Sequence, residues 1–556
     1  MSDLNQIESL INQGRYLEAR AQANLALKEK TDTRTQQLYA LAVSKSGEPE
    51  EARKFLEPIY QKDNVDPETA GILGGVYKEL FKKNYDNKFA LLSRDTYAKN
   101  FEATKSYYTG INAATMSAIA MQSSKSKILA KEVIDLISPE TGDFWELATL
   151  GEAYLLVKDK NRSIQEYSKA KNVAGSDWGK ITSVHNQLWL LNNFIPVSTE
   201  IQNLFSPPGI MAFTGHMIDH PDSNRVRFPE IIEPYVKRAI EGTLQTHNVK
   251  IGYTSLACGA DIIFAETLAE QNGEVHIYLP FNIDEFVNIS VRFAGEQWVE
   301  RFDALIKRFP VNMLTNESYA GHDDLFAIQS KIIFGAALIK TAGYHTNPKL
   351  LTVLSETDLK RLDGGTRDSL RFWPLGQGRI NINPDAFVPA GTVAPKKETL
   401  VRKVTQPDET RPTLYLLSAD VSEMNQLMSE KLLTTIKTRV ESDTMMFPTS
   451  RIDNKKIVVA CKTEAVMVEI MNLFKGHQKT KIALHVGPAL LADGFIRGTT
   501  VDVLNELEKY ATTSYISATS PIASLLALHP NEFSVGYSGF VRHKEQEYPV
   551  FKIEWI

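Results

Sequence analysis

The sequence predicts a multidomain protein, with an all-α N-terminal region, an α/β middle region and an α+β C-terminal region. The chain has 556 residues, more than one hydrophobic core usually holds. From Ser2 to about Asn193, Leu, Ala and Tyr recur at spacings of three and four residues, which indicates amphipathic helices. Pro207, Pro208 and Gly209 end this pattern, and segments typical of strands then alternate with helical ones.

Shifts in composition predict where the domains begin and end. We expect a helical domain over residues 1–200, an α/β domain over 207–386 and a terminal domain over 412–556. The intervening residues 387–411 are rich in Pro, Thr and charge and show little periodicity. Such a composition is typical of a linker.

The overall composition is that of a water-soluble globular protein. Hydrophobic residues make up 43% and charged residues 23%, and the longest apolar runs, such as 332–339, are too short to span a membrane. The polar start Met1-Ser-Asp-Leu-Asn does not resemble a signal peptide, so we expect a cytoplasmic location. Cys258 and Cys461 fall in different predicted domains, which favours reduced, buried thiols. The net charge of -5 argues against a large nucleic-acid surface.

Paired helices recur along the N-terminal region. Residues 10–27, 38–59 and 144–170 each read as a helix, a tight turn and a second helix, with Gly14 and Tyr16 at the first such turn. These units resemble degenerate tetratricopeptide repeats, and stacked repeats usually present a concave face to a protein partner. A plain helical bundle is the alternative.

The segment SYYTGINAAT, residues 106–115, joins a predicted turn to an alanine-rich helix. We expect Asn112 to cap that helix while Tyr107 and Tyr108 pack beneath it. The segment resembles the TRAF-binding, tetratricopeptide-like region of apoptosis signal-regulating kinases and of many bacterial multidomain proteins. By analogy only, the resemblance implies a role in conflict or stress signalling, including antiphage defence.

In the middle region, residues 251–281 predict a strand, a turn of small residues, a helix and another strand. Cys258, Gly259 and Ala260 leave space for a phosphate or a ribose at the strand end, where the following helix would offer its free N–H groups. Asp261 would lie in the first helical turn, where a ribose or base contact suits a carboxylate better than a phosphate does. This pattern predicts a nucleotide-like ligand.

Two further glycine turns follow predicted strands. One ends the strand 210–216, before a helix expected at about 229–246, and the other, at 363–368, follows the strand 350–354. In a parallel sheet all three turns would meet at the carboxyl edge, where open α/β folds bind ligands. The alternative is that the glycines only permit tight turns, and that His216 is a capping or core histidine.

Together the three turns resemble the SLOG superfamily, the relatives of the LOG and DprA proteins. The resemblance implies a Rossmann-like pocket for a nucleotide or a nucleotide-derived molecule. LOG enzymes carry a catalytic Glu in a PGGxGTxxE signature, whereas this chain has DGGTRDS without that Glu, which places N-glycosidic hydrolysis in doubt. The implied ligand-binding residues are Thr214, Gly215, His216, Cys258, Gly259, Ala260, Asp261, Gly364, Gly365 and Thr366.

In the C-terminal region, two aspartates lie next to predicted apolar strands. Asp420 ends the strand that begins near Leu414, and Asp453 precedes another strand. Two such carboxylates would be able to hold two divalent metals that polarise a triphosphate. The alternative is that both are solvated at strand ends.

The strand order of residues 413–556, the segment ALHVG at 483–487 and the closing hairpin resemble the class III adenylate and guanylate cyclase domain. Asp420 and Asp453 match its metal-binding aspartates, but Ile452 and Asn454 replace the glycines that flank the second one. The resemblance therefore gives the two aspartates only a tentative match to a metal site.

The other cyclase positions are altered as well. Thr449 and Phe495 stand at the base-reading positions, and Asp502 and Glu506 replace the asparagine and arginine that stabilise the transition state. Carboxylates there have the wrong sign for a reaction that builds negative charge, so we expect a pseudo-cyclase in which solvation of Asp420 and Asp453 is favoured over binding of Mg²⁺.

The sequence thus favours a non-catalytic signalling scaffold that senses a nucleotide-derived ligand and assembles protein partners through its helical repeats. A homodimer through the residues after Thr413 is expected from the cyclase resemblance. The alternative is an active enzyme, either a divergent nucleotidyl cyclase or a nucleotide hydrolase of the SLOG type. Binding of single-stranded DNA, implied by the DprA kinship, is disfavoured by the acidic charge.

Overall fold

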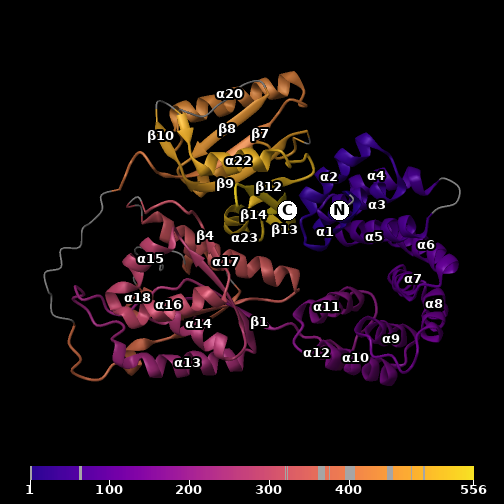
Figure 1. Cartoon of the computed structure of the whole chain (residues 1–556), viewed down its shortest axis with the longest axis horizontal. Helices are drawn as coiled ribbons and strands as arrows, with labels where there is room; N and C mark the ends of the chain where they lie inside the picture. Colours follow the sequence, from indigo (N-terminus) through magenta and orange to yellow (C-terminus); the bar gives the residue numbers. More distant parts are fainter. Residues whose placement is uncertain are drawn as a thin grey trace. The chain divides into compact units, whose positions relative to one another are not determined.

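The computed structural model describes residues 3–61, 66–319, 321, 323–360, 370–374, 376–394, 407–447, 455–477, 479–492 and 495–556. These residues form two compact units. The first contains the chain up to Pro207 and residues 537–540, and the second contains 208–536 and 541–556. Each unit is described below by itself (Figure 1).

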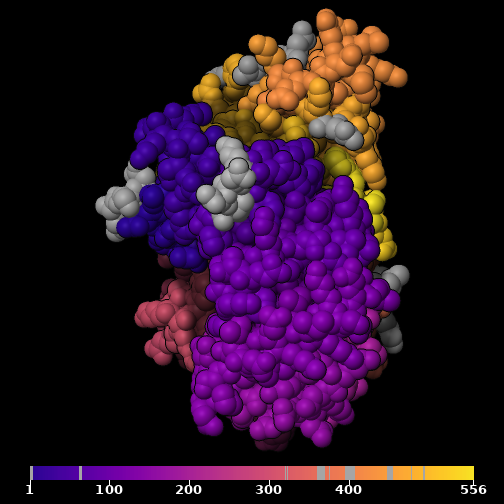
Figure 2. Space-filling view, turned by 90° about the vertical axis from the view of Figure 1, so that its right-hand side faces the viewer, coloured from indigo at the N-terminus to yellow at the C-terminus, as the bar shows by residue number. Residues whose placement is uncertain are grey.

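The first unit is helical, and consecutive helices pack as antiparallel neighbours. Contacts also join helices two apart in the chain, namely α1 with α3, α3 with α5, and α7 with α9. In Figure 2 these repeats form a continuous surface from indigo to purple. The helices are α1 (Asp3–Asn12), α2 (Tyr16–Glu29), α3 (Thr33–Lys45), α4 (Pro49–Tyr60), α5 (Pro67–Asn84), α6 (Asn87–Thr104), α7 (Tyr107–Ile119), α8 (Ser123–Leu136), α9 (Phe144–Val157), α10 (Lys160–Ala174), α11 (Trp178–Asn192) and α12 (Thr199–Leu204).

Carboxylates begin many of these helices. An aspartate side chain accepts a backbone N–H in the first turn of six helices, which satisfies a donor that has no partner inside the helix. The six caps are Asp32, Asp66, Asp86, Asp143, Asp159 and Asp177.

The predicted capping role of Asn112 is wrong. Helix α7 begins at Tyr107, with Ser106 at its N-cap, so Asn112 lies inside the helix. Its side chain donates to the carbonyl of Tyr108 at 2.8 Å. Tyr107 packs against the core as expected, but Tyr108 is 57% exposed. The helix starts earlier than expected because the two tyrosines belong to its first turn.

The second unit contains a parallel six-stranded sheet of order β4-β3-β2-β1-β5-β6. Helices lie between successive strands along the chain, which allows the strands to run parallel, as the alternation in the sequence predicts. The strands are β1 (Gly209–Gly215), β2 (Val249–Thr254), β3 (Glu274–Leu279), β4 (Val311–Met313), β5 (Lys349–Val353) and β6 (Gly378–Ile382). The helices are α13 (Glu233–Thr246), α14 (Ala260–Glu270), α15 (Ile283–Ser290), α16 (Glu296–Arg308), α17 (Asp324–Gly343) and α18 (Glu356–Lys360).

Both faces of this sheet are buried, and strand β1 shows how. Ile210 and Ala212 belong to a cluster with residues of α17, whereas Met211 and Phe213 belong to a cluster with residues of α13 and α14. The ring of Phe213 stacks on that of Phe264 at 4.3 Å. Neighbouring side chains on a strand point to opposite faces of the sheet. Since helices cover both faces, β1 is apolar throughout and lies in the middle of the domain.

Helix α17 is long and apolar enough to cross a membrane by length and composition. It packs, however, on β1, β2 and β3 and on the helix α23 (Ser520–Ala527), and 56% of its apolar window is buried. These contacts are those of a core helix in a globular protein.

A second six-stranded sheet has the order β13-β14-β12-β9-β7-β8 and is mixed, because β9 runs parallel to β12 and antiparallel to β7. Its strands are β7 (Thr413–Asp420), β8 (Lys456–Cys461), β9 (Lys481–Pro488), β12 (Ile516–Thr519), β13 (Phe533–His543) and β14 (Gln546–Trp555). Helices α20 (Gln426–Ser442), α21 (Glu464–Asn472), α22 (Thr499–Glu508) and α23 accompany it, with a small hairpin of β10 (Leu490–Ala492) and β11 (Phe495–Arg497).

Candidate functional site

The carboxyl ends of β1 and β5 form the best candidate site. Strand β1 pairs with β2 on one side and with β5 on the other. The chain leaves β1 through α13 toward β2, but it reaches β5 through α17 from the far edge of the sheet. The strand order therefore reverses between β1 and β5, and such a reversal is where ligands of open α/β sheets bind.

His216 directly follows β1 and meets residues that follow β5. Its Nε2 lies 3.2 Å from Oδ2 of Asp358 and accepts the backbone N–H of Ser355 at 3.3 Å. The N–H of Asp358 in turn donates to the Ser355 hydroxyl at 3.1 Å. Both ionisable side chains are buried, with 7% of His216 and none of Asp358 exposed. The imidazole therefore has a fixed position at the strand end.

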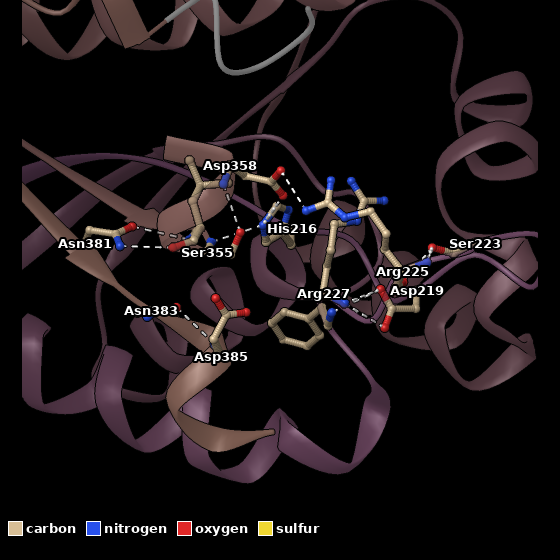
Figure 3. Close-up of polar contacts among 12 residues, drawn as sticks. His216, Asp219, Ser223, Arg225, Arg227, Ser355, Asp358, Asn381, Asn383 and Asp385 are labelled. Carbon is tan, nitrogen blue, oxygen red and sulfur yellow. Dashed lines mark hydrogen bonds and ion pairs between the residues drawn. The ribbon is translucent and has the colours of Figure 1, made fainter. Parts of the chain in front are cut away.

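Two arginines from the loop after β1 lie on the same side of His216 (Figure 3). Nη2 of Arg225 approaches Oδ1 of Asp358 at 3.4 Å. Asp219 folds the loop back on itself, because its carboxylate accepts the N–H groups of Arg227 and Phe228 at 3.0–3.1 Å. This brings two guanidinium groups, the side chains best suited to bidentate binding of phosphate, to the edge of the sheet.

Acidic groups lie on the other side of the cluster. Burial raises the pKa of Asp385, and the neighbouring Asp358 and Glu356 raise it further, while Arg225 opposes them. Asn381, on β6, bridges to β5 by accepting the N–H of Leu354 at 3.3 Å and donating to its carbonyl at 3.0 Å. Carboxylates beside arginines can accept the hydroxyls of a ribose whose phosphate binds the guanidinium groups.

The structure brings two of the predicted glycine turns together: the first turn, which follows β1, and the second turn, which precedes α14. The N–H of Ala260 donates to the carbonyl of His216 at 3.0 Å, and that of Ile218 donates to the carbonyl of Cys258 at 3.2 Å. Gly259 has φ +101°, and a Cβ there would lie 2.7 Å from the backbone nitrogen of Ile218. A Cβ on Gly215 would lie 2.5 Å from Cβ of Ala260. Only glycines permit this approach of the two turns.

Three backbone amides of the second turn already donate hydrogen bonds to acceptors within the protein. The N–H of Cys258 donates to the carbonyl of Ser290 at 2.9 Å, that of Ala260 to His216, and that of Ala257 to Oδ2 of Asp261 at 3.3 Å. These three amides are therefore not available to a phosphate in this structure. Contacts between the two turns and with α15 use the amides instead.

Asp261 lies in the first turn of α14, as predicted, but it is buried and its carboxylate points back to its own turn. Burial raises its pKa to about 7, although the backbone amides of Ala257 and Gly215 oppose this shift. Burial likewise raises the pKa of Cys258 to about 12, so this cysteine remains a thiol. Thr214 is also buried, within β1.

Of the remaining predicted site residues, Gly364, Gly365, Thr366 and Asp453 lie outside the described residues. Asp420 ends β7 and accepts the N–H and the hydroxyl of Ser422 at 3.0 and 2.6 Å. Burial raises its pKa, but these hydrogen bonds, together with Lys481 and Lys456, lower it below the ordinary value. Within the described ranges, no group of three or more His, Cys, Asp and Glu residues could hold a metal ion.

A cavity of about 600 Å³ adjoins Asp420, and lysines rather than further carboxylates dominate its lining. The two residues that the cyclase resemblance assigned to the transition-state positions are both acidic: Asp502 lies 3.8 Å from His543, and Glu506 pairs with Lys509 at 2.7 Å. The lining lysines are Lys455, Lys456, Lys481 and Lys509.

Sequence reasoning missed most of the polar cluster around His216. One signal was present: Ser355 follows the predicted strand directly, and Asp358 stands three residues later, the spacing of a helix-capping box. No periodic pattern marks the arginines, because the loop 217–229 is irregular. The missed residues are Arg225, Arg227, Ser355, Asp358, Asn381 and Asp385.

A family model described as Tetratricopeptide Repeats-Sensor matches residues 15–117. This region therefore contains tetratricopeptide-like helical repeats, and the alternative of a plain bundle is set aside. No relative was found among curated proteins.

Solved structures with similar parts include a thermophilic TPR protein from Thermus thermophilus, with 18% identity, coverage of 34% of this chain and 97% of that chain, and a TM-score of 0.29. An adenylate/guanylate cyclase/hydrolase from Silicibacter pomeroyi shares 16% identity over 26% of this chain and 97% of its own, with a TM-score of 0.20. The guanylyl cyclase Cya2 shares 14% identity over 26% and 92%, with a TM-score of 0.20. These scores are too low to carry an argument about function.

Proposed function

We propose that the protein is a non-catalytic signalling scaffold whose α/β region, residues 207–386, binds a nucleotide-derived ligand in a Rossmann-like, SLOG-like domain. The observation that carries the proposal is the cluster of His216, Asp358 and Arg225 at the point where the strand order reverses. Recognition would come from side chains rather than from the amides of the second turn. In this proposal the arginines bind phosphate and the carboxylates accept ribose hydroxyls.

The helical repeats would supply the protein partners of the scaffold, as stacked repeats commonly do. Residues 412–556 would be a pseudo-cyclase, in which Asp502 and Glu506 oppose the charge that cyclisation builds. A homodimer through this region and a cytoplasmic location complete the proposal.

Calorimetry with AMP, ADP, ADP-ribose and NAD tests the ligand site, and native mass spectrometry of the protein purified from cells identifies any bound molecule. We expect one of these nucleotides to bind the whole chain and Arg225→Ala to weaken its affinity about tenfold or more, because a charged contact to phosphate is lost. Arg238→Ala, which removes an exposed arginine from α13, is the matched control and should bind like the wild type. Absence of binding across the panel, or equal affinities in both variants, would refute the proposal.

One observation favours the alternative of a nucleotide hydrolase. A buried imidazole beside a buried carboxylate, as in His216 and Asp358, is an arrangement that general-base catalysis uses. Incubating the same nucleotides with the protein and separating the products by chromatography distinguishes the two functions. Product formation that His216→Gln abolishes would establish an enzyme, whereas binding without product supports the scaffold.

A further inference from the structure

The helical unit contains a cavity of about 500 Å³ between α3, α5, α6 and α7. A volume in this range is usual for sites that take small molecules. Its lining includes Lys45, Gly71, Gly75, Lys78, Asn112 and Tyr108. None of these residues belongs to the site around His216, so the cavity raises a separate question.

Lys78 is a cation in this cavity without a carboxylate at ion-pair distance among the described residues. Its Nζ donates to two neutral amides, Oδ1 of Asn112 at 2.9 Å and Oε1 of Gln187 at 3.1 Å. The nearest acidic group in the same network is Glu152, which accepts from Gln187 at 2.7 Å and from the hydroxyl of Thr115. The ammonium group therefore donates its hydrogen bonds to amides, while Glu152 and Glu79, a cavity residue that pairs with Lys82, act on it only at longer range.

The two ionisable groups of this network, Lys78 and Glu152, do not form a direct ion pair with each other. Burial lowers the pKa of Lys78 to about 8 and Lys82 lowers it further, whereas Glu152 and Glu79 oppose this shift. Burial also raises the pKa of Glu152, against the effect of Thr115, Lys78 and Gln187. Lys78 is nevertheless only partly buried, so its side chain can be reached from the cavity. An anion placed against Nζ would restore the favourable interaction that burial removes.

Two glycines keep the α5 wall of the cavity flat. A Cβ on Gly71 would meet only Nδ2 of Asn100, at 3.8 Å, and a Cβ on Gly75 would meet Oη of Tyr97 at 3.4 Å. Neither position requires glycine for packing, yet glycine in a helix interior is unfavourable. The two glycines therefore leave space along the α5 wall that a bound molecule would be able to fill.

We propose that this cavity binds a small anionic molecule, with its phosphate or carboxylate group on Lys78 and the rest of the molecule along the glycine wall of α5. An extended peptide is the less suitable occupant. The hydrogen bond from Lys78 on α5 to Gln187 on α11 fixes the position of the ammonium group beside the cavity, which suits a small anionic group better than an extended chain. The half-exposed ring of Tyr108 offers a flat surface to such a molecule.

Saturation-transfer NMR with acetate and methylphosphonate tests this proposal, because each probe carries one anionic group and one methyl signal. Acetamide serves as the neutral control. The experiment uses the whole chain with Arg225→Ala, so that any binding of the probes at the candidate site of the α/β region is weakened. We expect acetate or methylphosphonate to bind and acetamide to give no signal.

Two variants test the location. Lys78→Met and Gly71→Leu should each weaken the affinity about tenfold or more, the first by removing the charge and the second by filling the space. Gly71→Leu leaves the Lys78 network intact, so it distinguishes loss of the site from loss of the fold. Lys131→Met, at an exposed lysine of α8, should change nothing. Acetate affinity should also fall as the pH rises through about 8, because Lys78 loses its proton there.

Three outcomes would overturn the proposal. Equal signals from acetate and acetamide would show that the charge is not recognised. Equal affinities in wild type, Lys78→Met and Gly71→Leu would place the anion elsewhere. Binding of a ten-residue glutamate peptide without binding of either small anion would show a peptide groove instead.

Discussion

The carboxylate of Asp261 lies inside the turn that precedes α14, where it accepts a backbone N–H and little water reaches it. Its pKa is about 7 in the folded chain, compared with an ordinary value of 3.8. Between these two pH values the folded protein keeps a proton that the unfolded chain has lost. The free energy of unfolding should therefore fall as the pH rises from about 4 to about 7 and then level off.

Asp261→Asn should remove this fall in the free energy of unfolding, because the amide keeps the acceptor oxygen but carries no charge. Relative to wild type, the variant should gain about 2–4 kcal/mol of stability between pH 4.5 and pH 7.5, since each pKa unit corresponds to about 1.4 kcal/mol. Urea unfolding at several pH values measures the gain. Asp284→Asn, at an exposed carboxylate in the first turn of α15, is the control. Parallel pH profiles for Asp261→Asn and wild type would contradict the assignment.

Gly259, which directly precedes α14, allows the turn before this helix to pack against the turn after β1. Gly259→Ala should destabilise the protein by about 1–3 kcal/mol, because φ is +101° and the new Cβ would press on the backbone of Ile218. Denaturant unfolding measures the change. Gly242→Ala, on α13, meets no atom within 4 Å and should be neutral or stabilising. If the two variants were equally stable, the backbone strain assigned to Gly259 would be absent.

At the scale of elements, α17 links the parallel sheet to α23 within the second compact unit. The two helices approach so closely at Gly335 that a Cβ there would lie 1.8 Å from the backbone oxygen of Ser524. This contact explains why a helix apolar enough for a membrane is buried: it packs on a sheet with one side and on a helix with the other.

Gly335→Ala should therefore push α17 and α23 apart and lower stability by about 1–3 kcal/mol, the usual cost of overpacking. Thermal unfolding should show a lower Tm, and limited proteolysis should cut faster within residues 208–536. Gly343→Ala, at the end of the same helix, meets no atom within 4 Å and is the matched control. A Tm equal to that of the control would mean that the helices are not in contact at Gly335.

At the scale of the whole molecule, we propose two places for anionic ligands and a C-terminal region without cyclase activity. Arg225 and Arg227 provide positive charge at the sheet edge, and Lys78 provides it in the helical unit. In the C-terminal region, four lysines and Glu508 line the cavity beside Asp420. This distribution is the basis of the binding function that we propose.

We expect no cyclic nucleotide from ATP or GTP with Mg²⁺ or Mn²⁺, because Asp502 and Glu506 repel the charge that develops on the triphosphate. Loss of one transition-state donor alone costs about 3 kcal/mol. Mass spectrometry of the reaction mixture, with Asp420→Ala as the comparison, measures this. A product that Asp420→Ala eliminates would show an active cyclase.

Local patterns allowed much of the fold to be predicted. The predicted strands at 210–216 and 350–354 correspond to β1 and β5 within one residue, and the helix expected at about 229–246 corresponds to α13 after a short 3-10 turn. Periodicity and glycine turns are properties of short segments, so the sequence displays them directly. The role of Asn112 was mispredicted because the start of α7 depends on how its tyrosines pack.

The sequence by itself determined the alternation of strands and helices, the helical repeats and the two glycine turns that meet beside His216. Only the tertiary structure decided which polar groups share the site. Asp358 and Arg225 are 133 residues apart in the chain, and they meet because a parallel sheet gathers its strand ends at one edge. The same packing gives the amides of Ala257, Cys258 and Ala260 acceptors within the protein, which no local pattern in the sequence indicates.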